Sequence, residues 1–105
     1  MATIPQLMSV IQNGKNHALK ARQIAQLIGL PTGGNEVETR NLIRDAILRG
    51  YVIISTPKNG YWQSNNKNEV AKCIDSLNNR AQEIKNRSDA LKNAWNSANP
   101  NNIIP

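Results

Sequence analysis

The sequence has few residues with reactive or metal-binding side chains, since it holds one cysteine and one histidine. It also has no phenylalanine. Cys73 has no second thiol for an intrachain disulfide, and Cys73 and His17 together provide too few ligands for a structural zinc site. The apolar runs are short and interrupted by charge, and the N-terminal segment lacks the basic-then-apolar order of a secretion signal. We therefore expect a reduced, cytoplasmic protein that spans no membrane and has no cofactor.

The residue patterns of enzymes are missing as well. The sequence shows no acid/base pair, no nucleophile with a partner base, no metal-ligand cluster and no glycine-rich phosphate loop. We therefore expect a binding function and not catalysis.

Acidic residues are scarce relative to basic ones. Thirteen Lys and Arg residues face seven Asp and Glu residues, which gives a net charge of +6 on 105 residues. Residues 1–63 hold seven of the basic and three of the acidic residues. A positive field attracts polyanions before any specific contact forms. The distribution therefore favours polyanion binding by the first part of the chain, although a solvated basic surface is the simpler alternative.

Two helices are predicted near the N-terminus. Thr3 and Gln6 have the spacing of a capping box, and the helix that they begin is expected to run to about Asn13. A brief extended segment around residues 17–19 should then lead to a second helix over residues 22–28, which Gly29 ends.

A third helix follows the turn at residues 30–34, where a proline and two glycines interrupt the helical pattern. It should run from about Glu36 to Arg49, with Asn35 as its cap. Helical spacing separates its residues into two faces. The expected inward face holds Thr39, Ile43, Ala46 and Ile47, and the other face holds Val37, Arg40, Asn41, Arg44 and Leu48.

A β-hairpin is predicted after Gly50. Residues 51–56 are rich in β-branched side chains, and Asn59-Gly60 is a strong signal for a tight turn before a return strand at residues 61–63. Lys58 should lie at the tip of this hairpin. Tyr61 and Trp62 alternate on the return strand, so one of them is expected to pack in the core and the other to lie on the surface.

Residues 7–30 and 40–62 resemble the N-terminal winged-helix domain of biotin-repressor-type regulators and related small helix-turn-helix proteins of bacteria and phages. The resemblance spans about Leu7 to Gln63 and is strongest at the end of the third helix, residues 43–50, and at Gly60-Tyr61. It implies a winged helix-turn-helix that binds double-stranded DNA, and nothing in the sequence supports biotin chemistry.

In such a domain the third helix enters the major groove, where Arg pairs with guanine and Asn with adenine. Residues at the start of the second helix and at the wing tip would contact phosphates on the flanks. The alternative is that the same side chains only solvate the surface. The candidate DNA-contacting residues are Lys20, Arg22, Gln23, Asn35, Arg40, Asn41, Arg44, Lys58 and Asn59.

The last part of the chain has a heptad pattern. A long helix is predicted from Asn66 to about Ala98, followed by a flexible tail. Basic residues, namely Arg80, Lys85, Arg87 and Lys92, flank the apolar seam. The seam residues expected to mediate association are Val70, Ile74, Leu77, Ala81, Ile84, Leu91 and Trp95, with Ser88 at the remaining position.

The apolar seam is expected to pack against another surface. The sequence is compatible with three such surfaces: a second copy, the protein's own N-terminal domain, or another protein with acidic flanks. Because two-fold dimers are the default for small DNA-binding proteins, we expect a homodimer first, although basic flanks repel each other in a parallel pair. An acidic protein partner is the alternative.

Together these patterns predict a mainly α, α+β protein. A winged helix-turn-helix domain with a two-stranded β-wing over residues 1–64 precedes a long amphipathic association helix at residues 65–98 and a tail at residues 99–105. The expected function is sequence-specific binding of double-stranded DNA as a small transcriptional regulator, and the resemblance implies that a bacterium, a phage or a mobile element encodes it. The alternative is a non-enzymatic adaptor that binds an acidic partner in replication or phage takeover.

Overall fold

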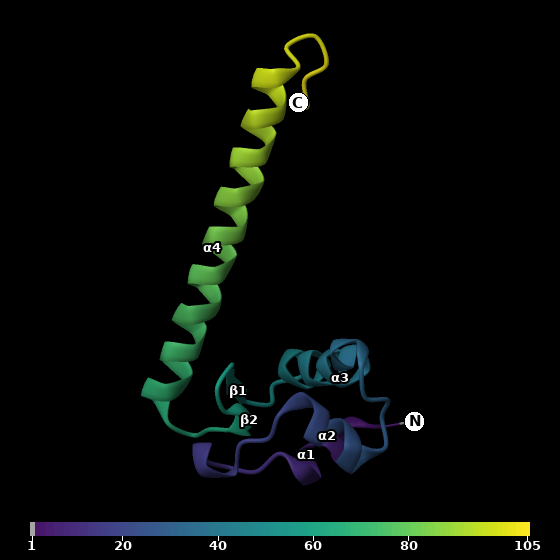
Figure 1. Cartoon of the computed structure of the whole chain (residues 1–105). Helices are drawn as coiled ribbons and strands as arrows, with labels where there is room; N and C mark the ends of the chain where they lie inside the picture. The colour runs from purple at the N-terminus through teal and green to yellow at the C-terminus, as the bar shows by residue number, and fades with distance from the viewer. Residues whose placement is uncertain (1) are drawn as a thin grey trace. The chain divides into compact units, whose positions relative to one another are not determined.

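Helices make up most of the chain in the computed structural model, which describes residues 2–105 (Figure 1). The predicted class is confirmed: the protein is mainly helical α+β with a two-stranded antiparallel sheet and a long C-terminal helix, a layout compatible with a winged helix. The elements are α1 (Ile4–Val10), α2 (Ala21–Ile28), α3 (Val37–Leu48), β1 (Ile53–Thr56), β2 (Gly60–Gln63) and α4 (Lys67–Ala98), with short 3-10 turns η1 (Lys15–His17) and η2 (Gly34–Glu36).

The chain divides into two compact units, one that ends at Cys73 and one that begins at Ile74. No helix among residues 2–105 has an apolar stretch long enough to cross a bilayer.

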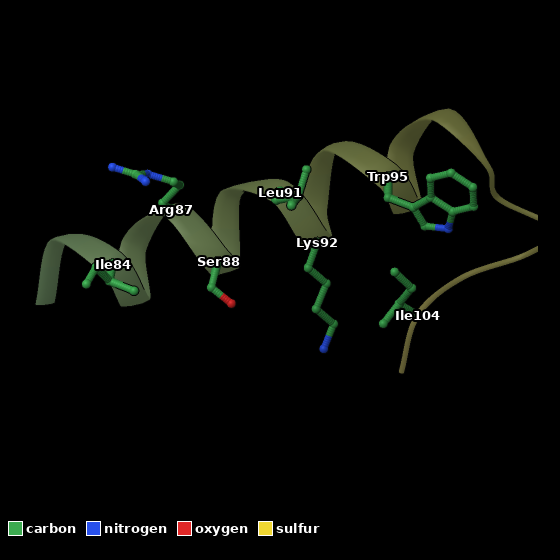
Figure 2. Close-up of a pocket in the computed structure, with 7 residues that line it drawn as sticks. All are labelled: Ile84, Arg87, Ser88, Leu91, Lys92, Trp95 and Ile104. Atoms are coloured by element: carbon green, nitrogen blue, oxygen red, sulfur yellow. The ribbon is translucent and has the colours of Figure 1, made fainter. Parts of the chain in front are cut away.

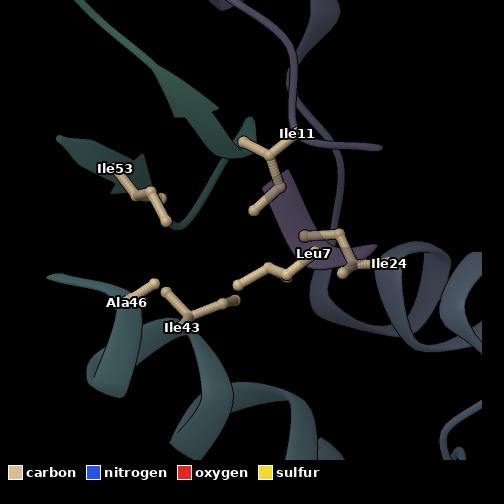
Figure 3. Close-up of a cluster of buried hydrophobic side chains, with 6 residues drawn as sticks. All are labelled: Leu7, Ile11, Ile24, Ile43, Ala46 and Ile53. Atoms are coloured by element: carbon tan, nitrogen blue, oxygen red, sulfur yellow. The ribbon is translucent and has the colours of Figure 1, made fainter. Parts of the chain in front are cut away.

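One apolar cluster holds the first unit together. Its members are at most 6% exposed and come from α1, the residue that follows it, α2, α3 and β1, so these segments share one core (Figure 3). Complete burial of each large aliphatic side chain contributes about 1.5 to 3 kcal/mol. The cluster consists of Leu7, Ile11, Ile24, Ile43, Ala46 and Ile53.

The first helix has the predicted capping box at Thr3 and Gln6, but it ends at Val10 and not near Asn13. Ile11 leaves the helical region because the next residues pair with the sheet: the backbone N–H of Gln63 donates to Gln12 O at 2.9 Å. This tertiary pairing overrides the weak local preference for another helical turn.

The second helix follows the prediction closely. It covers Ala21–Ile28 and ends at Gly29, which adopts the left-handed conformation with φ 75°. The side-chain oxygen of Gln23 accepts the backbone N–H of Lys20 at 2.8 Å and so satisfies a free donor at the start of the helix.

The start of the third helix corrects the prediction that Asn35 is its cap. Glu36 occupies the cap position with φ 51°, and no side-chain hydrogen bond caps this end within the described residues. Asn35 also has a left-handed backbone (φ 66°), and the Glu36 carboxylate turns back to accept the N–H of Gly33 at 3.0 Å. Ile47 is 46% exposed, so it does not belong to the inward face.

The hairpin pairs β1 with β2, with Ile54 opposite Trp62 in the register. The first strand starts at Ile53 and not at Tyr51, because the backbone N–H of Tyr51 donates to Ala46 O at the end of α3. Trp62 is buried, as predicted for one aromatic residue of the return strand. Tyr61 does not lie on the surface as expected for the other, because it is half-buried and packs against the apolar cluster.

The extended segment predicted around residues 17–19 is shorter than expected, because His17 belongs to the 3-10 turn η1. The segment is extended at Leu19, which pairs with Tyr61 of β2 in an antiparallel bridge. The two residues exchange backbone hydrogen bonds of 3.0 and 2.7 Å. The backbone of Leu19 therefore approaches Gly60 so closely that a Cβ at position 60 would lie 2.3 Å from Leu19 O. Only glycine fits there.

The long helix begins as predicted, because the side chain of Asn66 accepts the backbone N–H groups of Asn68 and Glu69. The Glu69 carboxylate also accepts hydrogen bonds from Ser64 Oγ at 2.7 Å and from Trp62 Nε1 at 3.3 Å. These two donors lower the pKa of Glu69, with the Ser64 hydroxyl contributing most. The first turns of α4 are thus tied to the hairpin, beyond the expected domain boundary at residue 64.

The residues after α4, expected to form a flexible tail, turn back along the end of the helix. Trp95 Nε1 donates to Asn102 O at 2.8 Å, and the Asn96 side chain exchanges two hydrogen bonds with the backbone of Ile104. The tail therefore has defined contacts with the last turns of α4.

The close approach at Gly60 yields a stability prediction. Gly60→Ala should lower the free energy of unfolding by about 2 to 4 kcal/mol, because the new Cβ collides with Leu19 O and the backbone has φ +97°. Gly34→Ala is the control, since its φ is also positive but nothing lies within 4 Å. It should cost only about 1 to 2 kcal/mol. Equal losses in urea denaturation would contradict the collision.

The Glu69 contacts predict a pH dependence. Because its pKa is lowered in the folded state, Glu69 adds stability above the unfolded pKa, and this contribution is lost as the pH falls through the folded pKa. Thermal unfolding should therefore show wild type to be more stable than Glu69→Gln at neutral pH, with a smaller difference in acid below the ordinary range of a Glu carboxyl. A constant difference at both pH values would refute the charge contribution.

Candidate nucleic-acid interface

The outward face of α3 is set by how its other face packs. Thr39, Ile43 and Ala46 are buried, with Ile43 and Ala46 in the apolar cluster (Figure 3). The side chains between them, Arg40, Asn41 and Arg44, are exposed, as the helical spacing predicted. The core therefore fixes which residues of this helix are available to a ligand.

Arg40 is held in place by two hydrogen bonds. Its Nε donates to Asn35 O at 2.6 Å, and its Nη1 donates to the Tyr61 hydroxyl at 3.0 Å. The guanidinium thus joins the start of α3 to the return strand of the hairpin. It has more N–H donors than these two bonds use, so it still has donors for an acceptor from outside.

Arg44 and Asn41 have few interactions with the protein. The nearest acidic group to Arg44 is Asp45, 4.0 Å away, and both side chains are more than half exposed. An exposed pair at this distance contributes little. No hydrogen bond engages the Asn41 side chain within residues 2–105. Both residues are therefore available for polar contacts along the outer face of α3.

The hairpin tip is ordered by its own side chains and by α2. Thr56 Oγ1 lies 3.0 Å from Asn59 Oδ1 and accepts the Asn59 backbone N–H at 3.1 Å. The Lys20 ammonium donates to the carbonyl oxygens of Pro57 and Lys58 at 2.8 and 2.6 Å. Lys20 therefore anchors the tip and places its positive charge against the backbone of the exposed Lys58.

The remaining candidates have mixed roles. Arg22 is exposed in the first turn of α2. Gln23 uses its side-chain oxygen to cap that helix, which leaves its amide donors. Asn35 contributes its backbone carbonyl to Arg40. The candidates with structural roles that the sequence patterns did not reveal are thus Lys20, Gln23, Asn35, Arg40 and Asn59.

Tyr61 was not among the candidates, although its hydroxyl positions Arg40. The two residues are 21 positions apart in the sequence, and no local pattern links them. Only the pairing of Leu19 with Tyr61 and the packing of α3 bring them together.

This surface carries mainly positive charge, with a few acidic residues among the basic ones. The basic candidates are Lys20, Arg22, Arg40, Arg44 and Lys58, whereas Glu36, Glu38 and Asp45 belong to α3 or its cap. Within residues 2–105 no group of three His, Cys, Asp or Glu side chains could hold a metal ion. The surface suits hydrogen bonding to an anionic polymer.

Comparisons with known proteins identify no relative of this chain: no family model, no curated protein and no solved structure matches it.

Proposed function

We propose that the first part of the chain is a winged helix-turn-helix domain that binds double-stranded DNA, and that the protein is a small transcriptional regulator. In this proposal α3 lies in the major groove and the β1–β2 hairpin is the wing. The observation that carries it is the outer face of α3, where the core leaves Arg40, Asn41 and Arg44 exposed together.

The chemistry of these three side chains suits base edges. A guanidinium donates to the O6 and N7 atoms of guanine, and an Asn amide both donates to and accepts from adenine. Because Arg40 is already held by Asn35 O and Tyr61, less side-chain entropy is lost when it binds. Arg44 and Asn41 would supply the more adaptable contacts.

Phosphate contacts would come from the flanks of α3. Lys58 at the hairpin tip is joined to the start of α2 through the Lys20 ammonium, and Arg22 lies in the first turn of that helix. Such contacts supply affinity without sequence preference. They also release counterions, so binding must weaken with salt.

The first test is titration of a labelled random-sequence duplex with the full chain at about 50 and about 200 mM salt. Two to five phosphate contacts should lower the affinity between about 10-fold and about 500-fold over this range. Absence of binding at the lower salt concentration would refute the proposal and favour the adaptor alternative.

Arg44→Ala should weaken binding to a duplex selected from a random pool by about 1 to 3 kcal/mol, because Arg44 is assigned a base contact. Thermal stability should hardly change, since the side chain is exposed and its ion pair with Asp45 is long. Arg49→Ala is the matched control: it removes the same charge at the end of the same helix, about 140° around the axis from Arg44. Equal losses for the two variants would show that α3 contributes charge and not base recognition.

Lys58→Ala tests the wing. Affinity for selected and random duplexes should fall by similar factors, and the slope of log affinity against log salt should decrease by about one, because a phosphate contact depends on charge alone. A loss confined to the selected duplex would instead make the wing tip a base-contacting element.

A further inference from the structure

The second unit exposes a continuous apolar stripe. Ile74, Leu77, Ile84, Leu91 and Trp95 are between 42% and 71% exposed, and none of the α4 side chains described is buried. Isolated exposed apolar residues are ordinary, but a stripe along several turns of one helix marks an interaction surface. We call residues 74–95 at heptad positions a and d the α4 seam.

Charge is distributed unequally around this helix. All four basic residues of the second unit, Arg80, Lys85, Arg87 and Lys92, occupy the e and g positions that border the seam. Its three acidic residues, Asp75, Glu83 and Asp89, occupy positions b and c on the outer side. The borders of the seam are thus entirely basic or neutral.

Most of this border charge is uncompensated. Lys85 pairs with Asp89 at 2.8 Å, toward the outer side of the helix. Within residues 2–105 no ion pair engages Arg80, Arg87 or Lys92. A ligand on the seam would therefore meet unpaired cations along both of its edges.

A shallow, open groove of about 570 Å³ lies along the C-terminal half of the seam. Every helical residue that lines it occupies an a, d, e or g position, and the returning tail adds Ile104 beside the end of the helix (Figure 2). The tail is fixed there by its hydrogen bonds to Trp95 and Asn96. The groove combines an apolar floor with the cations of Arg87 and Lys92.

A second copy of the chain fits this surface poorly. In a parallel pair the g and e positions of different copies face each other, so Arg80 would meet Lys85 and Arg87 would meet Lys92. In an antiparallel pair, e faces e and g faces g, which again offers no acidic residue to any of the cations. Like charges at these positions disfavour self-pairing and favour a different partner.

We propose that the α4 seam binds an acidic amphipathic helix of another protein, whose apolar residues pack on the seam and whose Asp or Glu side chains pair with Arg80, Arg87 and Lys92. DNA suits the surface less well, because a phosphate backbone offers no apolar face to Ile84, Leu91 and Trp95. This inference does not depend on DNA binding by the first unit.

The probe is a synthetic peptide of about four heptads with Leu at every a and d position and Glu at every e and g position. Its control is the same peptide with Lys in place of Glu. Calorimetric titration of the full chain should show a one-to-one complex with the Glu peptide and affinity for the Lys peptide that is lower by about tenfold or more.

Variants of the full chain test the surface. Joint substitution of Arg80→Glu, Arg87→Glu and Lys92→Glu should reverse the preference, so that the Lys peptide binds more tightly than the Glu peptide. Lys72→Glu lies at an outer f position and should leave the preference unchanged. Leu91→Ala should weaken both complexes, while circular dichroism shows unchanged helix content because this side chain is exposed.

Three results would overturn the proposal. If the two peptides bound equally, or if neither peptide bound, the electrostatic basis of the proposal would be refuted. Sedimentation of the full chain as a dimer at tens of micromolar, with Leu91→Ala as a monomer, would assign the seam to a second copy. Loss of duplex binding in the triple charge reversal, without any change in peptide preference, would assign these cations to DNA.

Discussion

Packing of α3 against the apolar cluster is the interaction on which the candidate interface depends. A helix of only seven residues, such as α1, is unstable alone, so α1 and its neighbours exist because Leu7, Ile24 and Ile43 bury one another. The same burial fixes the rotation of α3 about its axis. Its polar residues thereby become a defined surface with Arg40, Asn41 and Arg44 side by side.

Two of the charged candidate side chains already form hydrogen bonds within the fold. Lys20 binds the hairpin tip, and Arg40 links α3 to β2. These hydrogen bonds fix the positions of two positive charges without pairing them with a negative charge. Part of the side-chain entropy that DNA binding would otherwise cost is therefore already lost in the free protein. As a consequence, the side chains of Lys20 and Arg40 are less free than those of Arg44 or Lys58 to adapt to a ligand.

The two units differ in how much of their apolar surface they bury. The first buries its aliphatic side chains internally, whereas the second leaves a seam that its own residues cover only near Trp95 and Ile104. Helix formation alone does not require heptad apolar residues at an exposed surface. The open seam, its basic borders and its acidic outer side are the three observations on which the proposed acidic partner rests.

The sequence by itself determined the features that depend on neighbours a few residues away. The caps at Thr3 and Asn66 and the stop at Gly29 were predicted correctly, because each rests on local hydrogen bonds or on one backbone conformation. The hairpin was also predicted, but its turn covers residues 57–59, and Gly60 is the first residue of β2 and not part of the turn.

Only the tertiary structure decided the early end of α1 and the bond between Arg40 and Tyr61. Both depend on contacts between segments far apart in the chain. The free energy of such contacts comes from packing, which no local pattern records.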